Sequence, residues 1–248
     1  MTPGSPKPAS ESESLAGIEL VIFDKDGTLI DFHAMWGGWV TDLGRDLALA
    51  TGSPIGEALR RTMGVDASGR VLAHGALAAT PMARLRELVV ELLRERGSSA
   101  TDAERAVASA WRPPDPLSLA HPLADLDALF STLRGAGRRI AVATSDDRQP
   151  TAATLDGLGI SGLVDGIVCA DDGMPVKPAP DMVLHLCRTL GVDPSRTAMI
   201  GDTPADLLMG LAAGVSRRIG VLSGVGTRGN LAPLADAILP SIASLLER

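Results

Sequence analysis

The chain has 248 residues, which is enough for one large or two modest domains with a sizeable hydrophobic core. Its formal net charge of −7 argues against a nucleic acid partner, because contacts to phosphate backbones need clustered lysine and arginine. No apolar run approaches the ~20 residues that span a bilayer, and the N-terminus lacks an apolar signal core, so we expect a cytoplasmic protein without a membrane partner.

The first regular element is followed at once by two carboxylates. Residues 1–16 are rich in proline, serine and glutamate without apolar periodicity, which predicts a disordered tail. The apolar run Leu20–Phe23 is typical of a strand buried on both faces of a parallel sheet. Asp24 and Asp26 follow it, and Gly27 permits the positive φ of a sharp exit. Ligands of open α/β sheets bind beyond the carboxyl ends of strands, so this is a candidate site; the alternative is an ordinary Asp-Gly turn.

The next segment, residues 31–113, shows helical patterns without clear strands. We expect four helices there, at 34–50, 54–63, 81–96 and 101–111. The proline-rich residues 113–116 then form a stiff break that predicts a domain boundary. The chain is thus expected to carry an all-helical domain at 31–113, inserted into a core domain made of residues 17–30 and 114–248.

Helix and strand patterns alternate through the rest of the chain. The expected strands are 139–144, 166–170, 197–201 and 217–222, and the expected helices are 123–135, 149–158, 180–190, 204–213 and a short one near 241–247. Strands joined by helical crossovers form parallel sheets covered on both faces. The sequence therefore predicts an α/β fold with a Rossmann-like, three-layer core.

Polar residues follow three of the later apolar patterns. Thr144 and Ser145 end a strand and precede a helix, which indicates a phosphate site, although either hydroxyl could simply cap the helix. Lys177 is one of only three lysines, against twenty arginines, and stands among prolines; a fixed cation is favoured over an ordinary surface lysine. Asp202 and Asp206 again follow an apolar run, and Asp206 could instead be a helix N-terminal charge.

Together these residues define one chemistry. Asp24, Asp26 and Asp202 offer the hard oxygen ligands that Mg²⁺ takes along with waters and a substrate phosphate. Thr144 and Lys177 would hold the remaining phosphate oxygens. A carboxylate beside the metal can act as nucleophile, forming an aspartyl-phosphate, and a second carboxyl group can protonate the leaving oxygen and then activate water.

The four motifs, in this order, resemble those of the haloacid dehalogenase superfamily of phosphatases. The matching residues are Asp24-Lys25-Asp26-Gly27-Thr28, Thr144, Lys177 before Pro178, and Gly201-Asp202 with Asp206. The resemblance implies that Asp24 is the nucleophile and a metal ligand, and that Asp26 is the general acid/base and binds metal through its backbone carbonyl. It further implies phosphoryl binding by Thr144 and Lys177, Mg²⁺ binding by Asp202, and support of the metal or orientation of Lys177 by Asp206.

The inserted helical segment resembles the small cap of the phosphoglycolate phosphatase and β-phosphoglucomutase branch. His33 and Trp36 closely follow the first motif and are candidate substrate contacts. The resemblance implies that the second motif aspartate, Asp26, disfavours dehalogenation. The absence of lysine from residues 31–113 excludes phosphonatase chemistry through a cap Schiff base.

The resemblance therefore implies Mg²⁺-dependent hydrolysis of a small phosphorylated metabolite, of the phosphoglycolate or sugar-phosphate type. A phosphomutase of the β-phosphoglucomutase kind and a non-catalytic binding protein with this fold stay open as alternatives. A phospho-accepting receiver domain fits less well, because its acceptor lies on a later strand and it lacks so long an insert. No oligomeric state is assigned.

Overall fold

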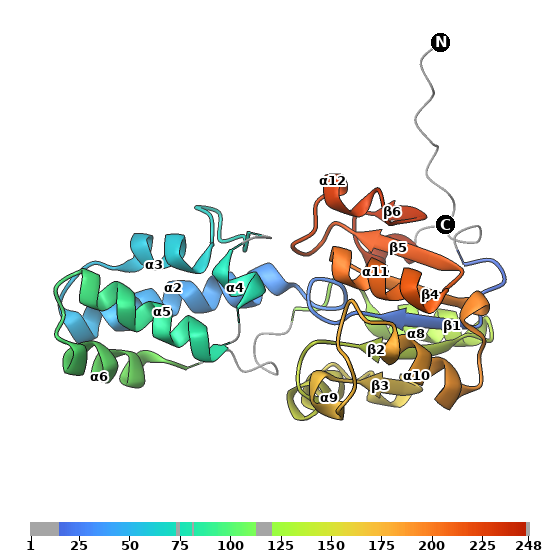
Figure 1. Ribbon diagram of the computed structural model, residues 1–248. Helices are drawn as coiled ribbons and strands as arrows, with labels where there is room; N and C mark the ends of the chain where they lie inside the picture. The colour runs from blue at the N-terminus through green and yellow to red at the C-terminus, as the bar shows by residue number, and fades with distance from the viewer. Residues whose placement is uncertain (1–14, 73–74, 81, 113–120, 247–248) are drawn as a thin grey trace, which may run out of the picture. The chain divides into compact units, whose positions relative to one another are not determined.

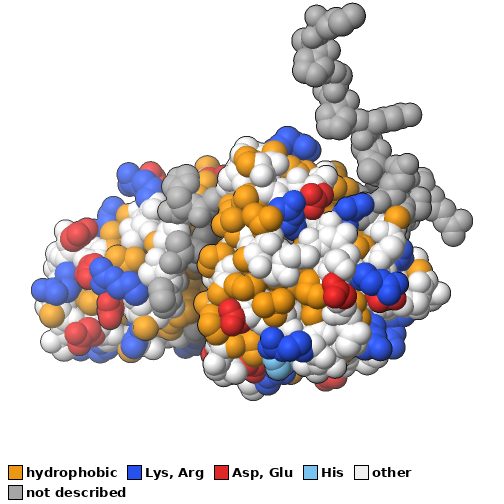
Figure 2. Space-filling model, turned by 45° about the vertical axis from the view of Figure 1, so that its right-hand side comes forward, with side chains coloured by type: hydrophobic (Ala, Val, Ile, Leu, Met, Phe, Trp, Pro, Cys, Tyr) orange, Lys and Arg blue, Asp and Glu red, His pale blue; other side chains and the backbone are white. Residues whose placement is uncertain are grey.

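The computed structural model describes residues 15–72, 75–80, 82–112 and 121–246. They form two compact units: one contains the described residues up to Ile30 and from Pro122 onward, and the other lies within Asp31–His121 (Figure 1). Among these described residues, no helix is both long and apolar enough to cross a bilayer. On the face that Figure 2 shows, basic and acidic side chains are interspersed over the surface that is described.

The first unit is built on a six-stranded parallel sheet with the order β3-β2-β1-β4-β5-β6. Its strands are β1 (Leu20–Phe23), β2 (Arg139–Ala143), β3 (Gly166–Val168), β4 (Thr197–Gly201), β5 (Arg217–Val221) and β6 (Ala237–Leu239). All four residues of β1 are fully buried, as expected for the central strand of a sheet covered on both faces. The expected Rossmann-like α/β core is thereby confirmed.

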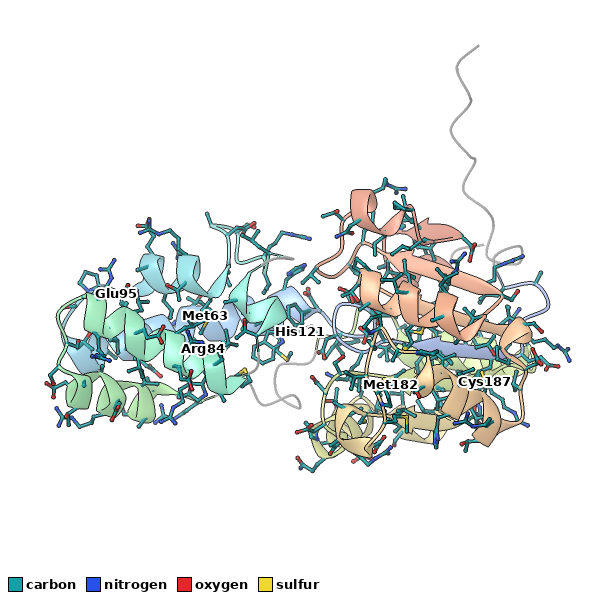
Figure 3. All side chains as sticks on the ribbon, viewed as in Figure 1. Met63, Arg84, Glu95, His121, Met182 and Cys187 are labelled. Carbon is teal, nitrogen blue, oxygen red and sulfur yellow. The ribbon has the colours of Figure 1, made fainter. Side chains whose placement is uncertain are left out.

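Helices cover both faces of this sheet. They are α8 (Leu126–Gly135), α9 (Arg148–Gly157), α10 (Asp181–Leu190), α11 (Pro204–Ala213) and α12 (Arg228–Leu231), with 3₁₀ turns η1 (Ser161–Leu163), η2 (Ala170–Asp172), η3 (Pro194–Arg196) and η4 (Ile242–Leu245). Ile22 of β1 packs with Met182 and Cys187 of α10, whose side chains are labelled in Figure 3. Phe23 instead contacts Phe130 of α8 at a ring-centroid distance of 5.3 Å. Because successive strand residues point to opposite faces, these contacts define three layers.

The observed boundaries of helices and strands agree best with the predicted ones where the sequence has clear capping or breaking residues at the ends of the element. β4 and α11 match their predicted ranges; α11 begins with a Thr203/Asp206 capping box and ends at Gly214 in the left-handed conformation. The short elements α12 and β6 were not predicted, and the expected C-terminal helix is the single 3₁₀ turn η4. The sequence also placed Leu15 in the tail, whereas its side chain is buried, with 1% exposed, because it packs into the hydrophobic core.

The second unit is helical. It contains α2 (Phe32–Thr51), α3 (Gly56–Met63), α4 (Ala76–Ala79), α5 (Met82–Glu95) and α6 (Ala100–Ala110). The side chain of Asp31 caps α2 by accepting a hydrogen bond from the backbone N–H of Ala34 at 2.9 Å. Trp39 is buried against Trp111 in an edge-to-face contact, with ring centroids 5.0 Å apart. The proline-rich boundary expected at 113–116 lies outside the described residues.

Candidate active site

Three adjacent strands, β1, β2 and β4, bring the candidate residues together at one edge of the sheet. Asp24 continues β1 with its backbone N–H donating to the carbonyl of Ile200 at 2.9 Å. Thr144 continues β2, and Asp202 follows β4 directly. All three side chains are buried. The carboxyl ends of parallel strands thus bring residues that are far apart in the sequence to the same edge of the sheet.

A buried lysine joins two of the acids. The ammonium of Lys177 forms an ion pair with Asp24 and lies 2.6 Å from Oδ1 of Asp206. The other oxygen of Asp206, Oδ2, accepts hydrogen bonds from the backbone N–H of Thr203 at 3.0 Å and from its hydroxyl at 2.6 Å. Asp206 is therefore fixed by the start of α11 and holds the Lys177 ammonium beside Asp24.

The acidic cluster fits a hard divalent cation. Carboxylate oxygens of Asp24, Asp202 and Asp206 lie within 4.8 Å of one another. Oδ2 of Asp202 accepts a hydrogen bond from the N–H of Val225 at 2.8 Å, whereas its Oδ1 is buried without a hydrogen-bond partner among the described residues. A buried, unpaired carboxylate oxygen is costly unless a cation coordinates it. The residues present therefore suit Mg²⁺.

Glycines allow two loops to approach Asp202 closely. Gly27 has a φ of +82°, and a Cβ there would lie 2.7 Å from Oδ2 of Asp202. A Cβ on Gly224 would lie 2.0 Å from the same oxygen. The positive φ expected for Gly27 is confirmed. The loop at 223–226 was missed from sequence because it carries no charged residue, although its position after β5 at the carboxyl edge was a usable signal.

Lys25, inside the first motif, forms a second buried cation. Its side chain is 2% exposed, and its Nζ lies 2.7 Å from Oδ2 of Asp26 and 2.9 Å from Oδ2 of Asp146. The expected metal contact of Asp26 uses its backbone carbonyl, which leaves this side chain free for the ion pair. Asp146 was not identified from sequence, because nothing in its neighbourhood marks it as a partner of the first motif.

The remaining candidates have differing surroundings. Thr28 is fully buried with an unpaired hydroxyl among the described residues, whereas Ser145 is exposed. His33 and Trp36 lie on α2 in the second unit. Nδ1 of His33 accepts a hydrogen bond from the N–H of Val71 at 3.0 Å, and the Trp36 ring packs 5.6 Å from that of Trp39. Substrate contact by His33 and Trp36 stays a prediction.

Burial dominates the electrostatics of the site. It raises the pKa of Asp24 to about 6, although the charge of Lys177 opposes the shift. It raises the pKa of Asp26 to about 7, with Lys25 opposing, and raises the pKa of Asp202 well above its ordinary value. Burial alone would lower the pKa of Lys177, but the charges of Asp206 and Asp24 raise it overall, so the ammonium stays charged.

These raised pKa values predict a pH-dependent stability in the absence of metal. The carboxyls of Asp24 and Asp26 ionise near pH 6 and 7 in the folded chain but near 3.8 when unfolded. The folded state therefore binds more protons between these values, and the free energy of unfolding should fall as pH rises from about 4 to 8. Mg²⁺ should oppose this loss, raising Tm by about 5–10 °C at pH 8 when present at about 100 times its Kd.

Thermal melts with EDTA and with Mg²⁺, at pH 5 and pH 8, measure this effect. The Mg²⁺-induced rise should be smaller at pH 5, where protons compete for the carboxylates. The variant Asp202→Asn should lose most of the rise at pH 8. An equal rise at both pH values would contradict the assignment of the cation site to this cluster.

Comparison with known proteins identifies the class to which this fold and site belong. Residues 18–214 match the family described as haloacid dehalogenase-like hydrolase. Because the match spans most of the chain, the chain belongs to this hydrolase family.

Two relatives and one solved structure are similar to this chain over most of its length. The phosphoglycolate phosphatase of Rhodospirillum rubrum is 34% identical over 196 residues, covering 79% of this chain and 76% of the relative. A Dickeya dadantii protein assigned as the phosphatase IndB is 34% identical over 213 residues, covering 86% of this chain and 84% of the relative. A Thermotoga maritima protein assigned as a β-phosphoglucomutase has the same fold, with a TM-score of 0.68 at 22% identity over 92% of this chain and 97% of that protein. Both relatives, which are 34% identical to this chain over most of its length, are thus named as phosphatases, whereas the solved structure shows a shared fold.

Proposed function

We propose that the chain hydrolyses a small phosphomonoester in a Mg²⁺-dependent reaction that passes through an aspartyl-phosphate on Asp24. The observation that carries this proposal is the buried pairing of the Asp24 carboxylate with the Lys177 ammonium, held in place by Asp206. A carboxylate beside a fixed cation can approach a phosphate dianion that would otherwise repel it. Burial at the carboxyl edge of the sheet strengthens that electrostatic effect.

The neighbouring residues have complementary roles in the proposal. Lys177 and the hydroxyl of Thr144 bind the transferring phosphoryl group; this hydroxyl accepts from the N–H of Asp146 at 3.2 Å, so its hydrogen is available to the phosphate. Asp26 protonates the leaving oxygen and later removes a proton from the attacking water. Mg²⁺, held by Asp24, Asp202 and the backbone carbonyl of Asp26, would neutralise charge on the phosphate.

The substrate class rests on the relatives. The Rhodospirillum relative, which shares 34% identity over most of both chains, is named for phosphoglycolate. We therefore propose a small phosphorylated organic acid or sugar as the substrate. The solved structure assigned as a mutase is 22% identical, which supports the fold and not the reaction.

The test is a screen of phosphorylated metabolites, including 2-phosphoglycolate and sugar phosphates, with Mg²⁺ and with EDTA. Inorganic phosphate and the dephosphorylated product should appear in equal amounts, and EDTA should stop their release. Accumulation of an isomeric sugar phosphate with little free phosphate would establish a phosphomutase instead. No Mg²⁺-dependent turnover of any member, or of p-nitrophenyl phosphate, would contradict the proposed function.

A further inference from the structure

We propose that Lys25 is a positioning residue that orients the Asp26 carboxyl as general acid and base. Its ammonium pairs with the carboxylates of both Asp26 and Asp146. This role rests on the proposed function and extends it to a residue that the motif does not explain. Lys25 is a large charged side chain that is buried in the sheet unit, with 2% of its surface exposed. An apolar residue could fill the same space without the cost of desolvating an ammonium, so its charge requires a reason.

The Lys25 ammonium bridges two loops of the same edge of the sheet. It lies 2.7 Å from Oδ2 of Asp26 on the loop after β1, and 2.9 Å from Oδ2 of Asp146 on the loop after β2. The side chain of Asp26 is 18% exposed and that of Asp146 is 46% exposed. The ion pair of Lys25 with Asp26 is therefore the stronger one, because Asp26 is more buried, and Asp146 is the partner nearer to solvent.

Both backbone polar groups of Asp146 form hydrogen bonds that fix its position. Its N–H donates to Oγ1 of Thr144 at 3.2 Å, and its carbonyl accepts from the N–H of Ala170 at 2.9 Å. The next turn is tied down as well, because the N–H of Arg148 donates to Oδ1 of Asp171 at 2.8 Å. Through Lys25, the position of the Asp26 carboxyl is thus fixed relative to Asp146 and to the neighbouring Thr144, the candidate phosphate-binding residue.

The contact with Lys25 also selects which oxygen of Asp26 carries the transferred proton. An ammonium has three donors and no acceptor, so Oδ2 of Asp26 must accept from it and the acidic hydrogen belongs on Oδ1. Oδ1 is buried and has no hydrogen-bond partner within the described part of the chain. Oδ1 is therefore the oxygen of Asp26 that Lys25 leaves unpaired, and in this proposal it exchanges the proton with the substrate.

The proton balance of both half-reactions follows from this arrangement. As the bond between phosphorus and the leaving oxygen breaks, the hydrogen on Oδ1 of Asp26 moves to that oxygen. As water attacks the phosphorus of the aspartyl-phosphate and the bond to Asp24 breaks, one water proton returns to Oδ1. The ammonium of Lys25 keeps its protons throughout and acts only by holding Oδ2.

The discriminating experiment compares two probes of similar size, p-nitrophenyl phosphate and benzyl phosphate, in the wild type and in Lys25→Met. Nitrophenolate leaves without a proton, whereas the benzyl alkoxide needs one. In Lys25→Met, the pre-steady-state burst of nitrophenol should keep its rate within a few fold. The kcat/KM for benzyl phosphate should fall about 100-fold, the loss that a misplaced catalytic group can cause. Steady-state release of nitrophenol should also slow, because breakdown of the aspartyl-phosphate needs the same carboxyl.

Two further variants and a control complete the design. Lys25→Arg keeps the charge and should recover part of the activity toward benzyl phosphate, while Asp146→Asn should show the same selectivity with a smaller loss. Cys187→Ala is the control for simple destabilisation: Cys187 is buried and contacts Thr197 at the start of β4, away from the carboxyl edge. Its Tm should fall without any change in the ratio of the two probes.

The outcomes separate this role from the proposed function. If Lys25→Met slows the nitrophenol burst and benzyl phosphate turnover equally, or leaves both unchanged, Lys25 does not position the acid, and the phosphatase assignment still stands. If the wild type with Mg²⁺ releases phosphate from neither probe and from no metabolite of the screen, the proposed function fails and the role of Lys25 fails with it.

Discussion

Asp24→Asn should abolish turnover, with a loss of more than about 10⁴-fold in kcat, because an amide oxygen does not form the aspartyl-phosphate. The substitution preserves the shape of the side chain beside Lys177, so the fold should persist. Quenched-flow trapping with ³²P-labelled substrate should detect no acid-stable phosphoenzyme in the variant. Circular dichroism should show an unchanged secondary structure.

A matched control for this substitution is Asp147→Asn. Asp147 is an exposed aspartate that follows β2, and its side chain makes no capping hydrogen bond to α9. Its kcat should stay within a few fold of the wild type. Turnover near the wild-type rate in Asp24→Asn would remove Asp24 from the mechanism.

Asp26→Asn should slow turnover by about 10²–10⁴-fold, the range attributed to general acid–base catalysis. Binding should be spared, since the Asp26 side chain pairs with Lys25 and the carboxylate cluster consists of Asp24, Asp202 and Asp206. Isothermal titration calorimetry should therefore give Kd values for Mg²⁺ and for inorganic phosphate within a few fold of the wild type. Loss of Mg²⁺ binding with an intact fold would show that the Asp26 carboxylate itself is a ligand.

The central part of the fold could be predicted because its signals are local and strong. β4 is a short apolar run bounded by polar residues, and α11 begins with Pro204 after a capping residue and ends before Gly214. β6 has only three residues, which is too short for a periodic pattern, and it is recognisable only through its pairing with β5. Its existence depends on the sheet and is not encoded in the segment alone.

The candidate site divides in a similar way. Asp24, Thr144 and Asp202 each follow a strand of the parallel sheet, and the carboxyl ends of such strands lie at one edge. Their shared location could therefore be predicted from the sequence. The pairing of Lys25 with Asp146 depends on side-chain directions in two loops, which no spacing rule describes. The loop at 223–226 contacts Asp202 through a backbone N–H and through the close approach that a glycine without a side chain allows. No charged or catalytic residue type in the loop indicates this contact.

The start of α11 has a consequence for how this protein can change over evolution. Asp206 nucleates the helix with one carboxylate oxygen and orients the Lys177 ammonium with the other. In the proposed reaction, thermal stability and turnover rate therefore depend on the same side chain, and a substitution of Asp206 should change both. Substitutions that adapt the stability to a different temperature are therefore expected outside residues 203–206, for example in the other helices or in the second unit. Residues 203–206 are expected to vary less, because both stability and turnover depend on them.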